Sequence, residues 1–73
     1  MIPRPARFHP VHHWEGRHLY LVWPHRRHYV GSVVRNHFLR TWAAWRRGEY
    51  VGSFTSEEGA RGAIEEVARE MDK

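Results

Sequence analysis

The sequence contains no cysteine, so neither a disulfide nor a thiolate-bound metal can stabilise the folded chain. It also contains no apolar run near the length of a membrane-spanning helix, and residues 1–16 lack the apolar core of a signal peptide. These absences predict a cytoplasmic protein, located in the host cytoplasm if a phage encodes it. With 73 residues, we expect one domain with a small core, so large aromatic side chains or a bound partner must supply part of its stability.

Acidic residues are scarce in residues 1–47, which hold nine arginines and only Glu15. Residues 48–73 reverse the balance, with seven acids against three basic residues. Such asymmetry is typical of a chain whose basic part meets a polyanion, although a solvated basic surface without a partner would look the same. Lys73 is the only lysine. The arginine guanidinium binds phosphate through paired hydrogen bonds and stacks on rings better than the lysine ammonium does, which favours a nucleic-acid partner. GC-rich codon usage would produce the same bias toward arginine.

Short apolar segments rich in β-formers follow a proline-rich start. Residues 1–17 hold three of the four prolines and show no period, which predicts an extended N-terminal arm. Four strand segments are then expected, at residues 18–23, 29–35, 39–47 and 49–54. Pro24 ends the first of them, and Gly31 inside the second indicates a bulge or a close backbone approach. Gly48 would supply the positive φ for a hairpin turn between the last two.

An amphipathic helix is predicted for the C-terminal segment. Thr55 is expected to cap it, with Glu58 reaching back as in a capping box. Apolar residues, most of them small, then recur at helical spacing, namely Ala60, Ala63, Ile64, Val67, Ala68 and Met71. Such a stripe lets a helix lie close to a sheet that contributes the bulky side chains. The predicted fold class is therefore α+β, a small antiparallel β-sheet of three to four strands packed on one C-terminal α-helix, in a single ββββα domain over residues 18–73.

Strand alternation divides the side chains of the last hairpin between two faces. Trp42 and Trp45 are expected to point in opposite directions, with Arg47 following Trp45. By the same alternation Tyr50 shares a face with Gly52. If the helix covers Trp42, then Trp45, Arg47 and Tyr50 form one exposed patch, and an exposed cluster of aromatic residues and arginine usually marks an interface. The alternative is that the N-terminal arm or the first strand covers this face.

Four short motifs carry a resemblance to a known family: Tyr29-Val30-Gly31, Trp42-Ala43-Ala44, Val51-Gly52-Ser53-Phe54 and Thr55-Ser56-Glu57-Glu58. Over residues 29–70 the chain resembles the DNA-binding domain of plant ethylene-response transcription factors, and it also looks similar to the arm-binding domains of phage integrases. The resemblance implies three strands followed by a helix, with the sheet laid into the major groove of DNA. It also implies a phage or mobile-element origin.

The resemblance implies contact roles for individual residues. Arg35 matches a contacting arginine of the family's first strand. Trp45 and Arg47 fall on contacting positions of its second strand, and Tyr50 falls on a contacting aromatic of its third. These positions would meet the DNA from the exposed face of the sheet.

Further arginines lie around the predicted sheet. Arg26 and Arg27, in the turn before the second strand, would clamp phosphates as nucleic acid enters, with Arg40 nearby. Each of these arginines alone fits a solvated loop better than a phosphate contact, and it is the group as a whole that favours binding. At two positions where the family carries arginines, this chain has Val30 and Val33, which favours a protein partner instead.

Neither an enzyme nor a metal site is predicted. Ser32, Ser53 and Ser56 have no triad context, and there is no Gly-rich phosphate loop. The seven histidines all lie within the first 37 residues, but they lack the spacing of a zinc site. No cofactor is therefore expected.

Two functions are compatible with these patterns. The first is a small basic nucleic-acid-binding protein that contacts DNA with a basic and aromatic sheet face, through Arg26, Arg27, Arg35, Arg40, Trp45, Arg47 and Tyr50. The second is a protein-interaction module that uses the same face, either a phage-type inhibitor or regulator of an acidic host protein or a homodimer. A membrane partner is not expected.

Overall fold

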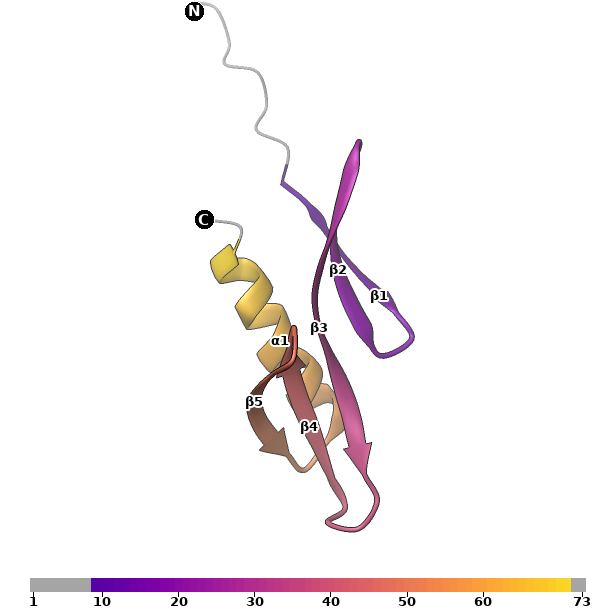
Figure 1. Cartoon of the computed structure of the whole chain (residues 1–73), viewed down its shortest axis with the longest axis vertical. Helices are drawn as coiled ribbons and strands as arrows, with labels where there is room; N and C mark the ends of the chain where they lie inside the picture. Colours follow the sequence, from indigo (N-terminus) through magenta and orange to yellow (C-terminus); the bar gives the residue numbers. More distant parts are fainter. Residues whose placement is uncertain (1–8, 72–73) are drawn as a thin grey trace, which may run out of the picture.

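The fold is a five-stranded antiparallel sheet packed against one C-terminal helix, which confirms the predicted α+β class. The computed structural model describes residues 9–71 of the chain. Its elements are β1 (Val11–Glu15), β2 (His18–Trp23), β3 (Arg26–Asn36), β4 (Thr41–Arg46), β5 (Glu49–Phe54) and α1 (Glu57–Met71). The strands lie side by side in chain order, each antiparallel to the next (Figure 1).

β1 lies in a segment for which the sequence predicts only an arm. The arm was expected over residues 1–17, but residues 11–15 pair with β2 along the length of the strand. This strand raises the count to five, against the three to four expected. Residues 1–8 of the expected arm lie outside the described residues.

Side chains of α1 hold the β1–β2 hairpin in place. The indole Nε1 of Trp14 donates a hydrogen bond of 3.0 Å to Glu65 Oε1. Arg61 Nη2 donates one of 2.9 Å to the carbonyl oxygen of Gly16, and the Arg61 guanidinium carbon lies 4.4 Å from the centroid of the Trp14 ring. These contacts join the hairpin to the helix through residues that are 51 and 45 positions apart in the chain.

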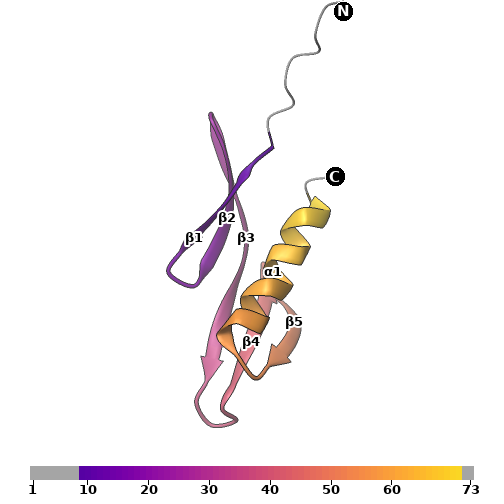
Figure 2. The ribbon, with the colours of Figure 1, turned by 180° about the vertical axis from the view of Figure 1, so that it is seen from behind.

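α1 lies against one face of the sheet (Figure 2), and a layer of apolar side chains fills the space between them. The buried residues are Leu19, Leu21, Val30, Val33, Trp42, Ala44, Ala60, Ile64 and Ala68. As the stripe predicts, the helix contributes mostly alanines and the sheet contributes most of the large residues. Burying one Leu or Val side chain is worth about 1.5–3 kcal/mol, so these few residues supply much of the stability. We call the covered side of the sheet the helix side and the other side the open face.

The first of two β-bulges lies between β2 and β3. The register pairs Leu19 with Gly31 but Tyr20 with Tyr29, so Val30 is an extra residue in β3. From Gly31 onward, each side chain of β3 therefore points to the face opposite to the one expected from simple alternation along the strand. The predicted bulge at this point is confirmed.

The second bulge inserts Val51 into β5 opposite β4. Simple alternation places Tyr50 on the face of Gly52, but that prediction is wrong because the extra residue puts Tyr50 on the face of Ser53. Tyr50 pairs with Trp45, and its hydroxyl forms a hydrogen bond with the Ser53 hydroxyl. Both bulges thus decide which side chains reach the open face.

Backbone geometry requires glycine at two positions. A Cβ added at Gly31 would lie 2.2 Å from the carbonyl oxygen of Trp45, so the predicted close approach is confirmed. Gly48 has a φ of 89° and Arg47 a φ of 48°. Two successive positive φ values are typical of the two-residue hairpin turn that matches strand twist, and the predicted turn at Gly48 is confirmed.

Ser56 caps α1. The backbone N–H of Gly59 donates a hydrogen bond of 3.0 Å to Ser56 Oγ, so the predicted cap at Thr55 is wrong by one residue. Glu57 and Glu58 occupy the first turn, where the helix dipole favours acids. The one helix that residues 9–71 form is neither long nor apolar enough to span a bilayer.

Candidate nucleic-acid interface

The open face is the side of the sheet that α1 leaves uncovered. α1 packs on the opposite side, and no element within residues 9–71 lies over the open face (Figures 1 and 2). β2 does not cover it, because this strand extends the sheet beside β3. Since directly paired residues point to the same side, one row of side chains crosses β2, β3, β4 and β5, namely His18, Ser32, Trp45 and Tyr50. We call it the central row.

Aromatic rings on this face contact one another in two groups. Trp45 and Tyr50 pack edge to face with ring centroids 5.4 Å apart, and Tyr50 is 57% exposed. Tyr20 and Tyr29 pair across β2 and β3 with centroids 5.3 Å apart. His18 joins this second group through a hydrogen bond of 3.0 Å between its Nδ1 and the Tyr29 hydroxyl. The rings are thus pre-positioned by the sheet rather than carried on loops.

Arg27 is the predicted site arginine whose contacts place it on the open face. Its guanidinium carbon lies 4.0 Å from the centroid of the Tyr20 ring, and its Nη2 donates a hydrogen bond of 2.7 Å to Glu15 Oε2. The hydrogen bond to this carboxylate raises the pKa of Arg27 above its ordinary value. Beside it lies a hollow of about 420 Å³, lined by Val11, His13, Val22 and Arg27. An apolar floor with a cation at its rim suits a flat, partly anionic group.

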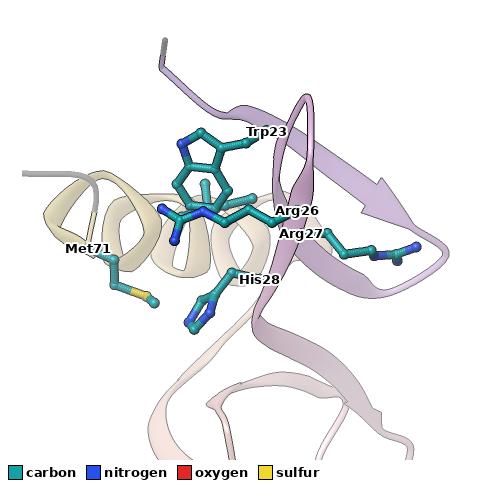
Figure 3. A pocket seen from close by; sticks show the side chains of 6 residues that line it. Trp23, Arg26, Arg27, His28 and Met71 are labelled. Atoms are coloured by element: carbon teal, nitrogen blue, oxygen red, sulfur yellow. The ribbon is translucent and has the colours of Figure 1, made fainter. Parts of the chain in front are cut away.

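Arg26 and Arg35 lie on the helix side of the sheet instead. The Arg26 guanidinium carbon is 4.2 Å from the centroid of the Trp23 ring, and that of Arg35 is 5.4 Å from the centroid of Trp42. Figure 3 shows Arg26 beside Trp23 while Arg27 extends from the other side of the hairpin. Arg35 reaches this side because the first bulge reverses the alternation of β3.

A second hollow, of about 250 Å³, opens between the β2–β3 hairpin and the end of α1 (Figure 3). Its lining residues are Leu21, Trp23, Arg26, Arg27, His28 and Met71. Within the described part of the chain, no buried side-chain nitrogen or oxygen lacks a hydrogen-bond partner.

Arg40 and Arg47 lie at opposite ends of β4, in turns. Both are exposed, with φ values of 54° and 48°. Asn36 Oδ1 organises the loop before Arg40 by accepting hydrogen bonds from the backbone N–H groups of Phe38 and Leu39, at 3.1 and 3.0 Å. Alternation predicts Arg47 inside the strand with Trp45, but β4 ends one residue earlier. Arg47 instead lines a hollow of about 450 Å³ at the turn, together with Arg46 and Glu49.

Charge is divided between the two layers of the molecule. α1 carries five acidic residues against two arginines. The strands and turns over residues 9–54 carry seven arginines against two acids, Glu15 and Glu49. A polyanion would therefore be repelled from the layer of α1 and attracted to the sheet and its turns.

Sequence reasoning did not select three of the rings on the open face, Tyr20, Tyr29 and His18. A signal was present, because Tyr20 lies between Leu19 and Leu21, and both leucines are buried on the helix side. Alternation alone could have assigned Tyr20 to the open face. Tyr29 could not be assigned in this way, since the bulge follows it directly.

Comparisons with protein-family models, with curated proteins and with solved structures find no match for this chain. What the chain shares with the family it resembles is the topology, an antiparallel sheet followed by a C-terminal helix. Among residues 9–71, no three His, Asp or Glu side chains come together as a metal site would require. The site must therefore be interpreted from its own rings and charges.

Proposed function

We propose that this protein binds nucleic acid, and DNA in the first instance, through the open face of its sheet. The observation that carries the proposal is the group of rings on a face that nothing in residues 9–71 covers, in a layer that also holds seven arginines. Nucleic acid offers phosphates to the arginines and base surfaces to the rings. The acids are concentrated in α1, on the other side of the sheet, which favours this orientation.

The arrangement of elements supports the same proposal. An antiparallel sheet that uses one face while a C-terminal helix supports the other is the topology of the DNA-binding domains that residues 29–70 resemble. Val30 and Val33, which stand where that family carries arginines, are fully buried under α1 here. Their side chains therefore serve the core, and the charges for a ligand must come from Arg27, Arg40 and Arg47. A phage or mobile-element origin remains part of the proposal.

Salt dependence of binding tests the proposal. We would titrate fluorescently labelled single-stranded and duplex DNA with the full chain and follow anisotropy at several salt concentrations. If these three arginines release phosphate counterions, the plot of log K against log salt should have a slope of about −2 to −3. Binding that does not respond to salt, or no binding at low salt, contradicts the proposal.

Protein interaction is the second candidate, and one observation favours it. Phe38 is 94% exposed and Leu39 is 62% exposed, side by side at the tip of the β3–β4 loop. Exposed apolar residues beside a cation are typical of protein interfaces, including contacts with an acidic host protein or a second copy of the chain. A pull-down from nuclease-treated host lysate tests it: a partner retained by the unaltered chain and lost in Phe38→Ala supports protein binding, and loss of all partners after nuclease contradicts it.

A further inference from the structure

We propose that the ligand of the open face is single-stranded nucleic acid, whose unpaired bases stack on the exposed ring of Tyr50 and the partly buried rings beside it. The inference rests on the proposed function and specifies its substrate class. It is drawn from the distribution of side chains on this face, where rings lie in the middle and arginines lie at the margins.

The middle of the open face offers rings and small side chains. The central row contains Trp45 and Tyr50, and the next paired row contains Val34, which is 50% exposed, and Ala43. A duplex presents phosphates and base edges to a protein, because the flat surfaces of its bases are stacked inside the helix. Exposed rings can stack only on bases that are unpaired.

The arginines that a duplex-reading sheet would need are turned away from this face. Base edges in the major groove are read mainly by arginine forks and amide side chains. Arg26 and Arg35 lie on the helix side, against the rings of Trp23 and Trp42. What remains near the open face is Arg27 and the arginines of the turns, which suits phosphate contacts at the margins.

The spacing of the two ring groups fits a nucleic-acid strand that runs across the β-strands of the sheet. Across the sheet, Tyr20 on β2 and Tyr50 on β5 are three strand spacings apart, about 14 Å, and Tyr20 lies two residues along β2 from the central row. The ring pair of Tyr20 and Tyr29 and the ring pair of Trp45 and Tyr50 thus form two platforms. Separate bases of one extended chain would stack on the two platforms, with the backbone running between them.

The hollow beside Tyr20 provides a third contact. Val11 and Val22 line this space of about 420 Å³, and the Arg27 guanidinium stands at its edge over the Tyr20 ring. A base can lie on the apolar part while its phosphate meets Arg27. The phosphate would then take the place of the Glu15 carboxylate as the partner of that guanidinium.

The decisive experiment compares a single strand with a duplex of the same sequence. The full chain is titrated with a labelled 12-nucleotide single strand and with the same sequence closed as a hairpin duplex, at equal ionic strength. We expect at least tenfold tighter binding of the single strand. Equal or tighter binding of the duplex overturns this inference and leaves the proposed function standing, whereas no binding of either overturns both.

Trp45 supplies a direct signal of stacking. It is the tryptophan on the open face, since Trp14, Trp23 and Trp42 all pack against the core on the helix side. Single strand should quench part of the tryptophan emission, and Trp45→Phe should abolish that part of the quenching. Binding without any change in Trp45 emission overturns stacking at this platform.

Removal of a ring tests the energetic contribution of stacking. Tyr50→Ala should weaken single-strand binding by about tenfold, because each stacked base depends on its ring, and should leave the salt slope unchanged. Phe38→Ala is the matched control, since it removes an exposed ring outside the open face. Circular dichroism verifies that both variants fold, and Tyr50→Leu, which keeps the bulk but not the ring, replaces Tyr50→Ala if that variant does not. Equal effects of the loop and face variants overturn the inference.

Discussion

Trp45 lies on the open face, packed edge to face against Tyr50 at 5.4 Å between ring centroids, and the planes of the two rings meet at 67°. Only three residues earlier in β4, Trp42 is buried under α1 and 8% exposed. An odd separation along a strand puts two side chains on opposite faces, so one short strand supplies a ring to the core and a ring to the surface. The bulge at Val51 completes the pair by turning Tyr50 toward Trp45.

Glu15→Gln should strengthen binding of nucleic acid. Glu15 holds the guanidinium of Arg27 through a 2.7 Å contact on the open face, and both side chains are about half exposed. Removing the carboxylate frees the cation for phosphate and removes a repulsive charge. We expect affinity to rise by about two- to fivefold at low salt, with a smaller difference at high salt because the contact is screened. Anisotropy titrations at two salt concentrations measure both effects.

Glu66→Gln is the matched control for this prediction. It makes the same change in net charge at an exposed ion pair, with Arg69, but on α1 and away from the open face. We expect it to change affinity by less than half as much, on a logarithmic scale, as Glu15→Gln does. Equal gains from the two variants would mean that net charge alone matters, and that the pairing of Glu15 with Arg27 has no special role.

Ser56→Ala should destabilise the protein, and Thr55→Ala should not. Ser56 Oγ accepts the N–H of Gly59, one of the donors that the first turn of a helix leaves without an internal partner. Loss of such a cap costs about 1 kcal/mol of the free energy of unfolding. Urea denaturation of the two variants measures the difference. A greater loss in Thr55→Ala would show that the cap lies one residue earlier, as the sequence pattern suggests.

The sequence predicted which helices and strands form better than it predicted which side chains lie on each face of the sheet. The stripe on α1 and the strand at residues 49–54 could be assigned because their patterns are local and complete. β1 could not be assigned in this way. Its alternation of valine, histidine and tryptophan indicates a strand only once β1 is paired with β2 and Trp14 donates its hydrogen bond to Glu65. An edge strand held by contacts with a distant helix leaves little local signal.

The candidate site was harder to predict, because bulges decide it. Trp45 was placed correctly on the face opposite Trp42, since no bulge interrupts the pairing of residues 42–45 with β3. Tyr50 was expected on the face of Gly52, and one extra residue, Val51, reverses that relationship. Arg35 reaches the helix side for the same kind of reason. Gly31 signals the first bulge, but the register at which the extra residue is inserted depends on how two strands twist and pair, which a single strand's sequence does not encode.

Gly31→Ala should be strongly destabilising. An added Cβ would lie 2.2 Å from the carbonyl oxygen of Trp45 and 3.2 Å from the Cα of Arg46. Both are backbone atoms, so β3 and β4 would have to separate. We expect a loss of at least about 2 kcal/mol in the free energy of unfolding, in the range of overpacked sites, together with weaker binding because Trp45 is displaced. A loss below 1 kcal/mol in urea denaturation would mean that the strands approach less closely here.

Gly62→Ala should stabilise the protein, in contrast to the other glycine of the same helix. A Cβ at Gly62 meets no atom within 4 Å, whereas one at Gly59 would meet Ser56 Oγ at 3.2 Å and Phe54 Cβ at 3.4 Å. Alanine in an exposed helix interior is favoured over glycine by about 0.5–1 kcal/mol. The reason is that the unfolded chain has less conformational entropy with alanine than with glycine, so less is lost on folding. Gly62→Ala should therefore raise the melting temperature by several degrees. Gly59→Ala should gain less or lose stability, since the new methyl group crowds the capping hydroxyl. Equal stabilisation by both variants would mean that the cap tolerates a side chain at residue 59.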